Sequence, residues 1–365
     1  MKKIITSLSL IILVLTLLSG CTVKMDDGSK EATGMVGEGK DATYVKKDGQ
    51  EVIYLAGGCF WGMEKLTSLL PGVIDATSGY ANGQGTDPTY EEVCTGGTGF
   101  KETVRVTYDP EAITLPEIIQ AYFLVIDPTL KDQQGNDKGT QYQTGIYYND
   151  SESAEMVEEI ISKIAKKYSS FKTEHQALIN FYDAESYHQD YLEKNTYGYC
   201  HIPSHEIDEV VALITAEESY QKPNQTELKE KLTSEQYEVT QNAATERAFS
   251  GEYWDTTAEG IYVDVTTGQP LFLSLDKYLS SCGWPSFSAP IYEGIVRYST
   301  DTSHSMTRTE VTSDLSGAHL GHVFSDDPES PNGTRFCINS ASLTFIPKAQ
   351  MTEKGYGAYL ILFKE

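Results

Sequence analysis

Cysteine is scarce in this chain, and the spacing of its six cysteines excludes one common use for them. They occupy positions 21, 59, 94, 200, 282 and 337 of 365, so no two lie within three residues of each other. A zinc ribbon requires paired Cys-x-x-Cys units. The sequence therefore excludes a zinc site of that kind.

Positive charge is also scarce. The chain has 28 Lys and Arg against 53 Asp and Glu, which gives a formal net charge of −25. Such an acidic surface disfavours nucleic acid and anionic lipid as partners and favours solubility. A solvated surface explains this charge equally well, so the charge identifies no substrate.

An apolar run at the start of the chain has the features of an export signal. Two lysines precede the run from Ile4 to Leu18, and small residues lead from it to Cys21. The run is too short and wrongly flanked for a spanning helix, so residues 1–20 are predicted to be a signal peptide. The sequence at 18–21, Leu-Ser-Gly-Cys, resembles the bacterial lipoprotein box, which implies cleavage before Cys21 and lipid on its sulfur. The alternative is an ordinary signal peptide with an incidental cysteine.

Residues 21–50 are polar and lack apolar periodicity, so they are predicted to form a flexible, lipid-anchored tether. The lipoprotein interpretation places the protein on the extracytoplasmic face of a bacterial membrane. If Cys21 carries lipid, five cysteines remain, an odd number for a purely structural disulfide framework. Few, widely spaced thiols in an exported protein favour redox chemistry. Two disulfides and one spare thiol are the alternative.

Residues 51–205 are predicted to form a first domain of the α/β (α+β) class, with helices on a mixed sheet. β-branched and aromatic segments alternate there with segments of helical periodicity. The expected strands are 52–55, 104–108 and 143–148, and the expected helices are 59–70, 114–126 and 151–168. Thr114 and Glu117 form the pattern of a capping box.

Residues 206–226 are predicted to be a connector, within which 210–214 could still pack on the first domain. Residues 227–365 are predicted to form a second, mainly β domain of antiparallel sheets. The expected strands there are 261–265, 270–273, 335–338, 343–346 and 359–363. No repeat relates the two halves.

The first notable cysteine, Cys59, follows a strand and two glycines and stands where a helix should begin. The positive end of a helix dipole lowers the pKa of a thiol placed there. Phe60 and Trp61 could wall an apolar pocket for a methyl group, and the glycines leave room for a ligand. A core cysteine flanked by core aromatics is the alternative.

The first domain closely resembles methionine sulfoxide reductase A. The resemblance rests on Gly-Cys-Phe-Trp-Gly at 58–62, Asp-Pro-Thr-Tyr-Glu-Glu-Val-Cys-Thr-Gly at 87–96, Asp-Pro-Thr at 127–129 and Gln-Gly-Asn-Asp-Lys-Gly-Thr-Gln-Tyr at 134–142. It implies a nucleophile at Cys59, an acid at Glu102, oxygen-binding Tyr90 and Tyr142, Asp137, a methyl pocket of Phe60 and Trp61, and a resolving thiol at Cys200.

Sulfoxide chemistry fits this set of residues. The sulfur of a sulfoxide is a weak electrophile until its oxygen is hydrogen-bonded or protonated. A carboxyl whose pKa is raised by an apolar pocket, here Glu102, can supply that proton. The thiolate then attacks, methionine leaves, and a sulfenic acid remains that condenses with a second thiol to form a disulfide. The chain departs from the family pattern at Phe100, where histidine is common, and at Gln143, where arginine is common. Cys94 is interpreted as a packing residue.

A second cluster of polar residues and cysteine lies near the end of the chain. His319 and His322 stand three residues apart, and Cys337 lies in a β-type segment. The histidines could bind a metal on a helix, but the surrounding glycines and β-type context disfavour a helix. The alternative is a pair of polar groups that hold a sulfoxide oxygen beside a thiol.

The second domain strongly resembles methionine sulfoxide reductase B. The segments are Glu-Gln-Tyr-Glu-Val-Thr-Gln at 235–241, Thr-Glu-Arg at 245–247, Ser-Cys-Gly-Trp-Pro-Ser-Phe at 281–287, Arg-Thr-Glu-Val at 308–311, the histidine pair and Arg-Phe-Cys-Ile-Asn-Ser-Ala-Ser-Leu at 335–343. The resemblance implies a nucleophile at Cys337, a resolving thiol at Cys282, sulfoxide contacts from His319, His322 and Asn339, a methyl pocket at Trp284, and support of the Cys337 thiolate by Arg335.

The resemblance further implies the reaction and its partners. Two domains specific for the S and R epimers would repair oxidised proteins and peptides. Each turnover leaves a disulfide, so an external thioredoxin-like dithiol is expected as reductant, with no bound cofactor. Many relatives of the second domain hold structural zinc through two Cys-x-x-Cys pairs. Asp264 and Thr267 stand where the first pair is expected, and 313–316 contains no cysteine. The sequence therefore predicts a zinc-free form.

Two other functions remain open. An acidic surface lipoprotein could use Cys59–Cys200 and Cys282–Cys337 bonds only to brace binding domains. A thiol peroxidase would share the sulfenic chemistry but would have no use for a methyl pocket. The reductase hypothesis requires the sulfurs of Cys59 and Cys337 to be exposed and ionised, each within reach of its partner thiol.

Overall fold

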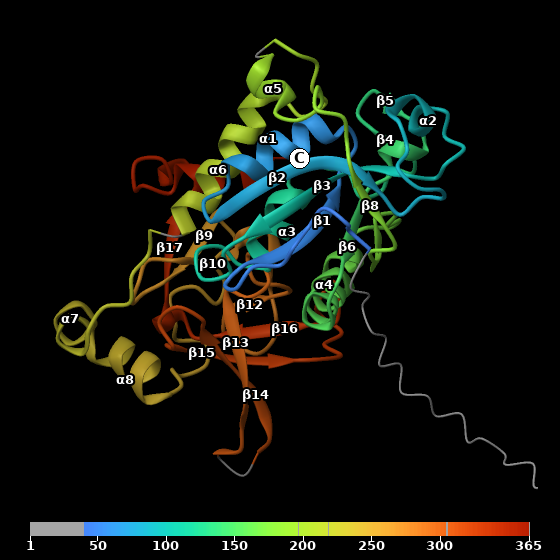
Figure 1. The fold of residues 1–365 in the computed structure, drawn as a ribbon. Coiled ribbons are helices and arrows are strands. Elements are labelled where there is room, and N and C mark those ends of the chain that lie inside the picture. The colour runs from blue at the N-terminus through green and yellow to red at the C-terminus, as the bar shows by residue number, and fades with distance from the viewer. Residues whose placement is uncertain (1–39, 196, 218, 304–305, 365) are drawn as a thin grey trace, which may run out of the picture. The chain divides into compact units, whose positions relative to one another are not determined.

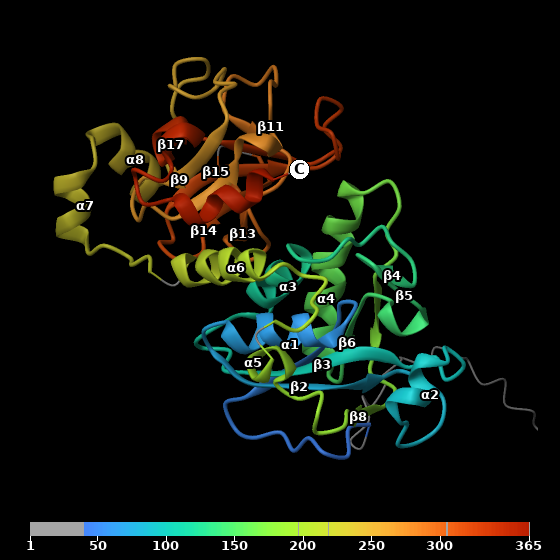
Figure 2. The same cartoon turned by 90° about the horizontal axis from the view of Figure 1, so that it is seen from above.

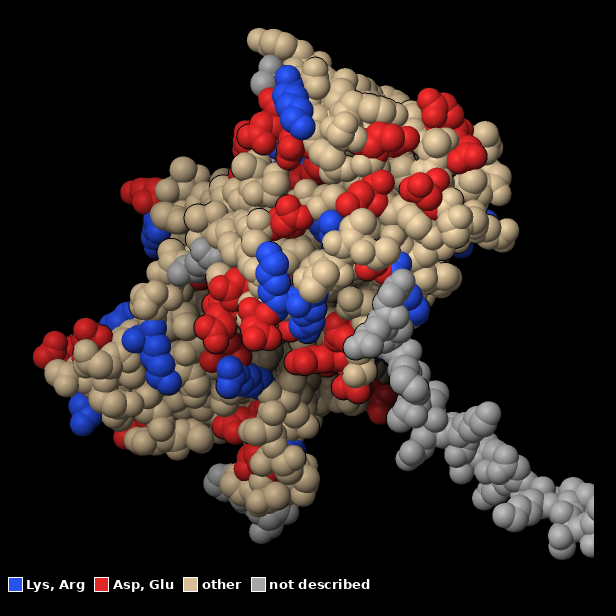
Figure 3. Space-filling model, in the orientation of Figure 1, with Lys and Arg blue, Asp and Glu red and all other residues tan. Residues whose placement is uncertain are grey.

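The computed structural model describes residues 40–364 except 196, 218, 304 and 305. The predicted signal peptide, Cys21 and most of the predicted tether lie outside these residues. Within this part of the chain, no helix is long and apolar enough to cross a membrane. Figure 3 shows acidic and basic side chains interspersed over the face in view.

The first domain is built on a six-stranded sheet in the order β7-β6-β1-β3-β2-β8 (Figure 1). Its elements are β1 (Glu51–Ala56), α1 (Phe60–Leu69), β2 (Val73–Ala81), α2 (Tyr90–Cys94), β3 (Lys101–Tyr108), α3 (Leu115–Phe123), β4 (Gln133–Gln134), β5 (Asp137–Lys138), η1 (Thr140–Tyr142), β6 (Gly145–Tyr148), α4 (Ser151–Ile164), η2 (Ala165–Lys167), β7 (Glu174–Ala177), β8 (Phe181–Asp183), α5 (Tyr191–Lys194) and α6 (Ser204–Glu217). Neighbouring strands are antiparallel except β6 and β7, which are parallel. The predicted mixed sheet with helices is confirmed.

The central strand β1 is buried on both faces because its side chains alternate. Ile53 and Leu55 belong to the main apolar core, whereas Val52, Tyr54 and Ala56 belong to a smaller cluster with Phe181. Figure 2 shows α1, α3 and α4 on the same side of this sheet. A buried sheet of this kind provides a rigid base for the segment that follows β1, which carries Cys59.

The second domain is mainly β, as predicted. Its elements are α7 (Gln225–Lys231), α8 (Ser234–Asn242), β9 (Gly260–Asp264), β10 (Pro270–Leu273), η3 (Ser274–Asp276), β11 (Lys277–Tyr278), β12 (Ser286–Phe287), β13 (Val296–Asp301), β14 (Arg308–Ser313), β15 (His319–Phe324), β16 (Arg335–Ile338), η5 (Ser340–Ser342), β17 (Leu343–Pro347), η6 (Lys348–Gln350) and η7 (Gly357–Phe363). Two antiparallel sheets have the orders β10-β9-β17 and β11-β12-β16-β15-β14-β13.

The strand predicted at 359–363 is wrong, because this segment lies in the 3₁₀ helix η7. A short apolar run does not fix its own period, so strand and helix are equally compatible with it. Here η7 contacts α6 and buries Tyr359 and Ile361 instead of joining a sheet. Residues 204–217, at the start of the predicted connector, form α6 and bury Val210, Leu213 and Ile214.

Candidate active sites

Cys59 is the N-cap of α1, at the point where the chain leaves β1. Three neighbouring glycines make its tight surroundings possible. A Cβ at Gly57 would lie 2.1 Å from the Met63 side chain, and one at Gly62 would lie 2.7 Å from the sulfur of Cys200. Gly58 has φ +83°, a conformation that side chains rarely adopt. Glycine is therefore required here both for backbone conformation and for close packing.

The structure contradicts the expectation that Cys59 is exposed and ionised. The residue is only 6% exposed. Burial, the largest cause, and the nearby Glu102 carboxyl raise the pKa of the Cys59 thiol, while the backbone N–H of Trp61 lowers it less. A helix terminus contributes about 1 kcal/mol, less than one pKa unit. Burial can shift a pKa by roughly 3 units, so desolvation outweighs the helix terminus.

Glu102 is the buried acid of this site. It lies on β3, is 1% exposed, and its Oε2 accepts a hydrogen bond from the backbone N–H of Phe60 at 3.1 Å. Burial raises the pKa of Glu102 to about 8, and the charge of Asp137 adds to this. The carboxyl is therefore protonated at neutral pH, as the sequence argument required. It can donate a proton beside Cys59.

The aromatic side chains that follow Cys59 are held by other rings. The Trp61 indole N–H donates to Nδ1 of His188 at 3.1 Å, and the indole stacks on Tyr191 with ring centroids 3.8 Å apart. Phe60 lies against His188 and Tyr80, with centroids 4.9 and 5.9 Å apart. His188, Tyr191 and Tyr80 thus hold in place the two aromatic side chains that are predicted to line the methyl pocket.

Tyr90 and Tyr142 lie in the same region. Tyr90 begins α2, its backbone N–H donates to Glu185 at 2.8 Å, and its ring lies 4.6 Å from that of His188. Burial raises the pKa of both Tyr90 and Tyr142, with Glu102 as a further cause in each case. Both phenols are therefore neutral hydrogen-bond donors, and the electrostatic influence of Glu102 reaches both.

Cys200 and Asp137 complete the first site. The sulfur of Cys200 faces Gly62 in the first turn of α1. Burial, with a contribution from Asp137, raises the pKa of Cys200. One oxygen of Asp137 is buried without a hydrogen-bond partner among the described residues and lies 3.8 Å from Nδ1 of His201. The structure thus brings together the predicted residues of this site.

The two departures from the family pattern have local structural roles. Phe100 packs so closely on Gly83 that a Cβ there would lie 2.2 Å from the ring. Gln143 accepts from the backbone N–H of Asp132 and donates to the Lys172 carbonyl, each at 2.8 Å. Cys94 is exposed, so the expectation that it packs in a core is wrong.

In the second domain the two predicted thiols touch. The sulfur of Cys282 lies 3.5 Å from that of Cys337. Cys337 lies on β16, where it pairs with Ser286 of β12 on one side and with His322 of β15 on the other. A disulfide requires a sulfur separation of about 2.05 Å. The pair can therefore form this bond with a small shift of one side chain.

This thiol pair ionises as a unit. The hydrogen bond from Cys337 lowers the pKa of Cys282 to about 4, and the hydroxyls of Ser280 and Ser286 contribute. The same hydrogen bond raises the pKa of Cys337, because Cys337 donates its proton to that bond. The charge of Arg335 lowers the pKa of Cys337 by a smaller amount. The first proton leaves the pair easily and the second does not. Cys337 itself is partly exposed, but its raised pKa contradicts the expectation that Cys337 is the ionised sulfur, since the negative charge of the pair rests on Cys282.

A carboxylate holds each of the two predicted histidines. Nδ1 of His319 lies 2.7 Å from Glu310, and Nε2 of His322 lies 2.7 Å from Asp301. The rings are 5.5 Å apart, and Nε2 of His319 is buried without a partner among the described residues. Both lie on a strand, β15. The geometry therefore leaves one imidazole nitrogen available for a ligand.

Asn339 and Trp284 are anchored to one loop. Asn339 accepts from the backbone N–H of Glu246 at 3.1 Å and donates to the Leu320 carbonyl at 2.9 Å. The Trp284 indole N–H donates to the Glu246 carbonyl at 3.2 Å. Arg335 pairs with Asp327. Gly321 permits the approach of β15 to β16, since a Cβ there would lie 2.1 Å from the Cys337 carbonyl oxygen.

The segments for which the resemblance implied zinc ligands in many relatives contain a hydrogen-bonded cluster here. The fully buried Asp264 accepts bonds from the backbone N–H and hydroxyl of Thr266 and from the hydroxyl of Ser316, each at 2.7 Å. Among the described residues no group of three or more His, Cys, Asp and Glu side chains is arranged to hold a metal. Hydroxyls and a single carboxylate that already accepts three hydrogen bonds do not match the ligand set of a zinc site.

Two family models match the chain. One, described as peptide methionine sulfoxide reductase, matches residues 51–219, and the other, described as SelR domain, matches residues 232–347. The chain belongs to the methionine sulfoxide reductases. Its first, A-type domain acts on the S epimer of methionine sulfoxide and its second, B-type domain acts on the R epimer.

Three solved structures resemble part of the chain. Reduced Mxr1 from Saccharomyces cerevisiae is 36% identical, with 44% of this chain and 94% of that chain covered and a TM-score of 0.42. Methionine sulfoxide reductase A of Corynebacterium diphtheriae is 39% identical, with 42% and 79% covered and a TM-score of 0.40. Mxr1 in complex with Trx2 is 25% identical, with 41% and 91% covered and a TM-score of 0.30.

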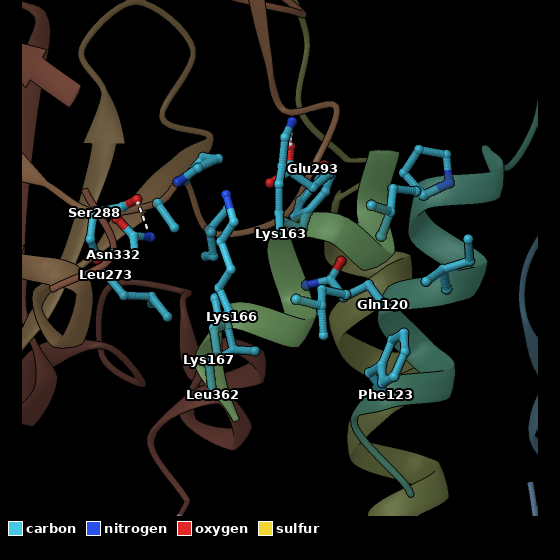
Figure 4. A pocket seen from close by; sticks show the side chains of 18 of the residues that line it. Gln120, Phe123, Lys163, Lys166, Lys167, Leu273, Ser288, Glu293, Asn332 and Leu362 are labelled. Atoms are coloured by element: carbon cyan, nitrogen blue, oxygen red, sulfur yellow. Dashed lines mark hydrogen bonds and ion pairs between the residues drawn. The ribbon is translucent and has the colours of Figure 1, made fainter. Parts of the chain in front are cut away.

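A cavity of about 1190 Å³ lies away from both thiol sites. Figure 4 shows part of its lining. It is lined by Gln120, Phe123, Lys163, Leu273 and Asn332 among others, and by none of the cysteines. Glu293 pairs with Lys163 at 2.6 Å in this region. This cavity therefore does not mark the place of the thiol chemistry.

Sequence reasoning missed the residues that support both sites. It assigned no role to His188, Tyr191, His201 or Asp301, and it included Glu310 only as part of the segment at 308–311. Their signal was weak, since His188 and Tyr191 are distant in the chain from Trp61, and Asp301 lies 21 residues from His322. The presence of a histidine directly after Cys200 was the one local indication available.

Proposed function

We propose that the A-type domain reduces the S epimer through Cys59 and Cys200, and the B-type domain the R epimer through Cys337 and Cys282. In both domains the nucleophile becomes a sulfenic acid and then a disulfide. The observation that carries this proposal is the pairing of thiols, best defined by the 3.5 Å between the sulfurs of Cys282 and Cys337.

In the A-type domain, the neutral Glu102 carboxyl donates a hydrogen bond or proton to the sulfoxide oxygen, which Tyr90 and Tyr142 also bind. Cys59 attacks the sulfur, and the oxygen passes to it as methionine leaves. The thiol proton and the sulfoxide oxygen end together in the sulfenic S–O–H, so atoms balance. Because Cys59 is buried and neutral before substrate binds, substrate polarisation and proton transfer are coupled in this domain.

In the B-type domain, the thiol pair already favours one ionisation, and Arg335 lies beside it. The proposed oxygen-binding groups are His319 and His322, with Asn339 fixing the adjoining backbone. Glu310 leaves Nε2 of His319 available for the sulfoxide oxygen or a bridging water. Trp284 provides the methyl contact.

Recycling requires two electrons for each disulfide, and these must come from a reductant. We therefore propose an external thioredoxin-like dithiol, whose own disulfide is the product, and no bound cofactor. The substrates are methionine sulfoxides in oxidised proteins and peptides. The B-type domain is expected to work without zinc, because Asp264 and Ser316 hydrogen-bond each other where relatives have metal ligands.

For location, we propose removal of residues 1–20, lipid on Cys21 and attachment to the extracytoplasmic face of a bacterial membrane. The support is the apolar run from Ile4 to Leu18 followed by Leu-Ser-Gly-Cys. Few exported proteins keep free thiols unless the thiols react. The mass of the mature N-terminus tests this, since an unmodified Met1 would exclude it.

The decisive experiment is epimer-resolved reduction of a methionine sulfoxide peptide with dithiothreitol. Cys59→Ser should abolish reduction of the S epimer and spare the R epimer, and Cys337→Ser should do the reverse. Cys94→Ser is the matched control and should retain both activities. Loss of neither epimer in the two nucleophile variants would refute the assignment of Cys59 and Cys337.

A further inference from the structure

His201 is a buried imidazole with no established task. Its side chain is 3% exposed, and neither ring nitrogen makes a hydrogen bond of good geometry among the described residues, although the Gly57 backbone lies close enough to act on the ring. Buried polar side chains almost always have such partners, so an exception calls for a functional explanation. A purely packing role does not explain two unpaired nitrogens in the interior of an enzyme site.

His201 lies between the chain segments that carry the two thiols of the A-type domain. It follows Cys200 directly in the chain, and Cys200 faces the first turn of α1. On the other side, Nε2 of His201 would lie 3.0 Å from a Cβ at Gly58, the residue before Cys59. The ring thus lies against the backbone that carries the nucleophile and is attached to the backbone that carries its partner.

Charged and titratable groups around the ring favour proton exchange. Asp137 of β5 lies 3.8 Å from Nδ1, and the same carboxylate raises the pKa of Tyr199, after burial as the largest cause. Burial lowers the pKa of His201, whereas Asp137 and the carbonyl of Gly57 raise it. The resting imidazole is therefore neutral at pH 7, and Asp137 stabilises the imidazolium that forms when it accepts a proton.

The second step of the reaction needs such a group. Cys59–S–O–H and Cys200–S–H combine to Cys59–S–S–Cys200 and water. The S–O and S–H bonds break, and the S–S bond and an O–H bond of water form. The sulfur of Cys59 is reduced and that of Cys200 is oxidised, so no outside electrons are needed. However, the Cys200 proton must leave a thiol whose pKa is raised by burial, and the departing oxygen must gain a proton.

We propose that His201 carries this proton, accepting it from Cys200 and returning it to the oxygen that leaves Cys59. This inference rests on the proposed function and assigns a residue to its disulfide-forming step. Sulfoxide reduction itself uses Glu102, which lies on a different element, so the two steps use separate proton donors. Asp137 then belongs to this second step as well, through its charge on His201.

The test follows single turnovers of the full chain carrying Cys337→Ser, which silences the B-type domain. The chain is mixed with the S epimer of a methionine sulfoxide peptide without reductant. Methionine release reports the first step, and loss of free thiols reports the second. His201→Gln keeps the volume of the side chain but cannot carry a proton. His205→Gln, a change at an exposed histidine on α6, is the matched control.

We expect His201→Gln to slow disulfide formation about 100-fold, in the usual range for loss of a proton-transfer group. Methionine release should slow less than about threefold, and sulfenic acid should accumulate and be trapped by dimedone. With His201 present, disulfide formation should slow as pH falls through its lowered pKa, because protonation removes the base. This inflection should vanish in His201→Gln.

Equal slowing of both steps, or an unchanged rate of disulfide formation, would overturn the proposal. The pH inflection needs no variant, so its absence in the chain with His201 would overturn it even if His201→Gln failed to fold. Failure of the proposed function looks different. A chain with intact Cys59 and His201 would then release no methionine from the S epimer.

Discussion

In the A-type domain the proposed nucleophile Cys59 lies buried at the start of a helix, beside a carboxyl that stays protonated. In the B-type domain Cys337 lies in a β-sheet, with its partner thiol already in contact and carboxylate-held histidines nearby. The first site has no thiolate before substrate binds, whereas the thiol pair of the second site favours one negative charge, which rests on Cys282 and not on Cys337. The same reaction can therefore start from a site whose thiol and carboxyl are both protonated or from a site with one thiolate.

The largest effect that would test this contrast concerns Glu102. Glu102→Gln should lower kcat/KM for the S epimer about 1000-fold, because an amide cannot give a proton to the sulfoxide oxygen. Reduction of the R epimer by the same chain is the internal control and should not change. A loss under tenfold would show that the tyrosines polarise the sulfoxide without the acid.

The next effect concerns the cluster that stands where relatives hold zinc. Asp264→Ala leaves the hydroxyl and N–H of Thr266 and the hydroxyl of Ser316 without an acceptor, which should cost about 3 kcal/mol. In urea, R-epimer activity should then be lost at lower concentration while S-epimer activity keeps its midpoint. Glu353→Ala, at an exposed position, should move neither midpoint.

The two domains should also differ in their response to pH. Reduction of the S epimer requires protonated Glu102, so its kcat/KM should fall about tenfold per pH unit above about 8. The R epimer requires no such carboxyl. Parallel measurements of both epimers between pH 6 and 10 should therefore diverge. Coincident profiles would contradict separate proton sources.

The smallest expected effect sharpens the role of Glu310. Glu310→Gln keeps an acceptor for Nδ1 of His319 but removes the charge that raises the pKa of that imidazole against burial. We expect a loss of roughly fivefold in kcat/KM for the R epimer, since charge-assisted bonds are about twice as strong as neutral ones. Glu259→Gln, at an exposed salt bridge, should change neither activity.

The sequence predicted both domains and brought the right residue types to attention, because Gly58-Cys59-Phe60-Trp61 and the segment around Cys337 are local patterns. It could not predict that Cys59 is 6% exposed, since the groups around it, such as Glu102, Asp137 and Cys200, come from distant parts of the chain. For that reason burial raises the pKa of Cys59, whereas the sequence had suggested that the helix dipole lowers it. The 3₁₀ helix at 357–363 was missed because its apolar run fits either period.

The sequence by itself determined the chemical groups, the family and the order of the two domains, because these depend on residue identity and local spacing. Only the tertiary structure decided the protonation of those groups. Desolvation keeps Glu102 and Cys59 neutral, and a thiol contact favours one ionisation of the Cys282–Cys337 pair. A pKa reflects the water and charge around a group, and segments far apart in the chain supply both.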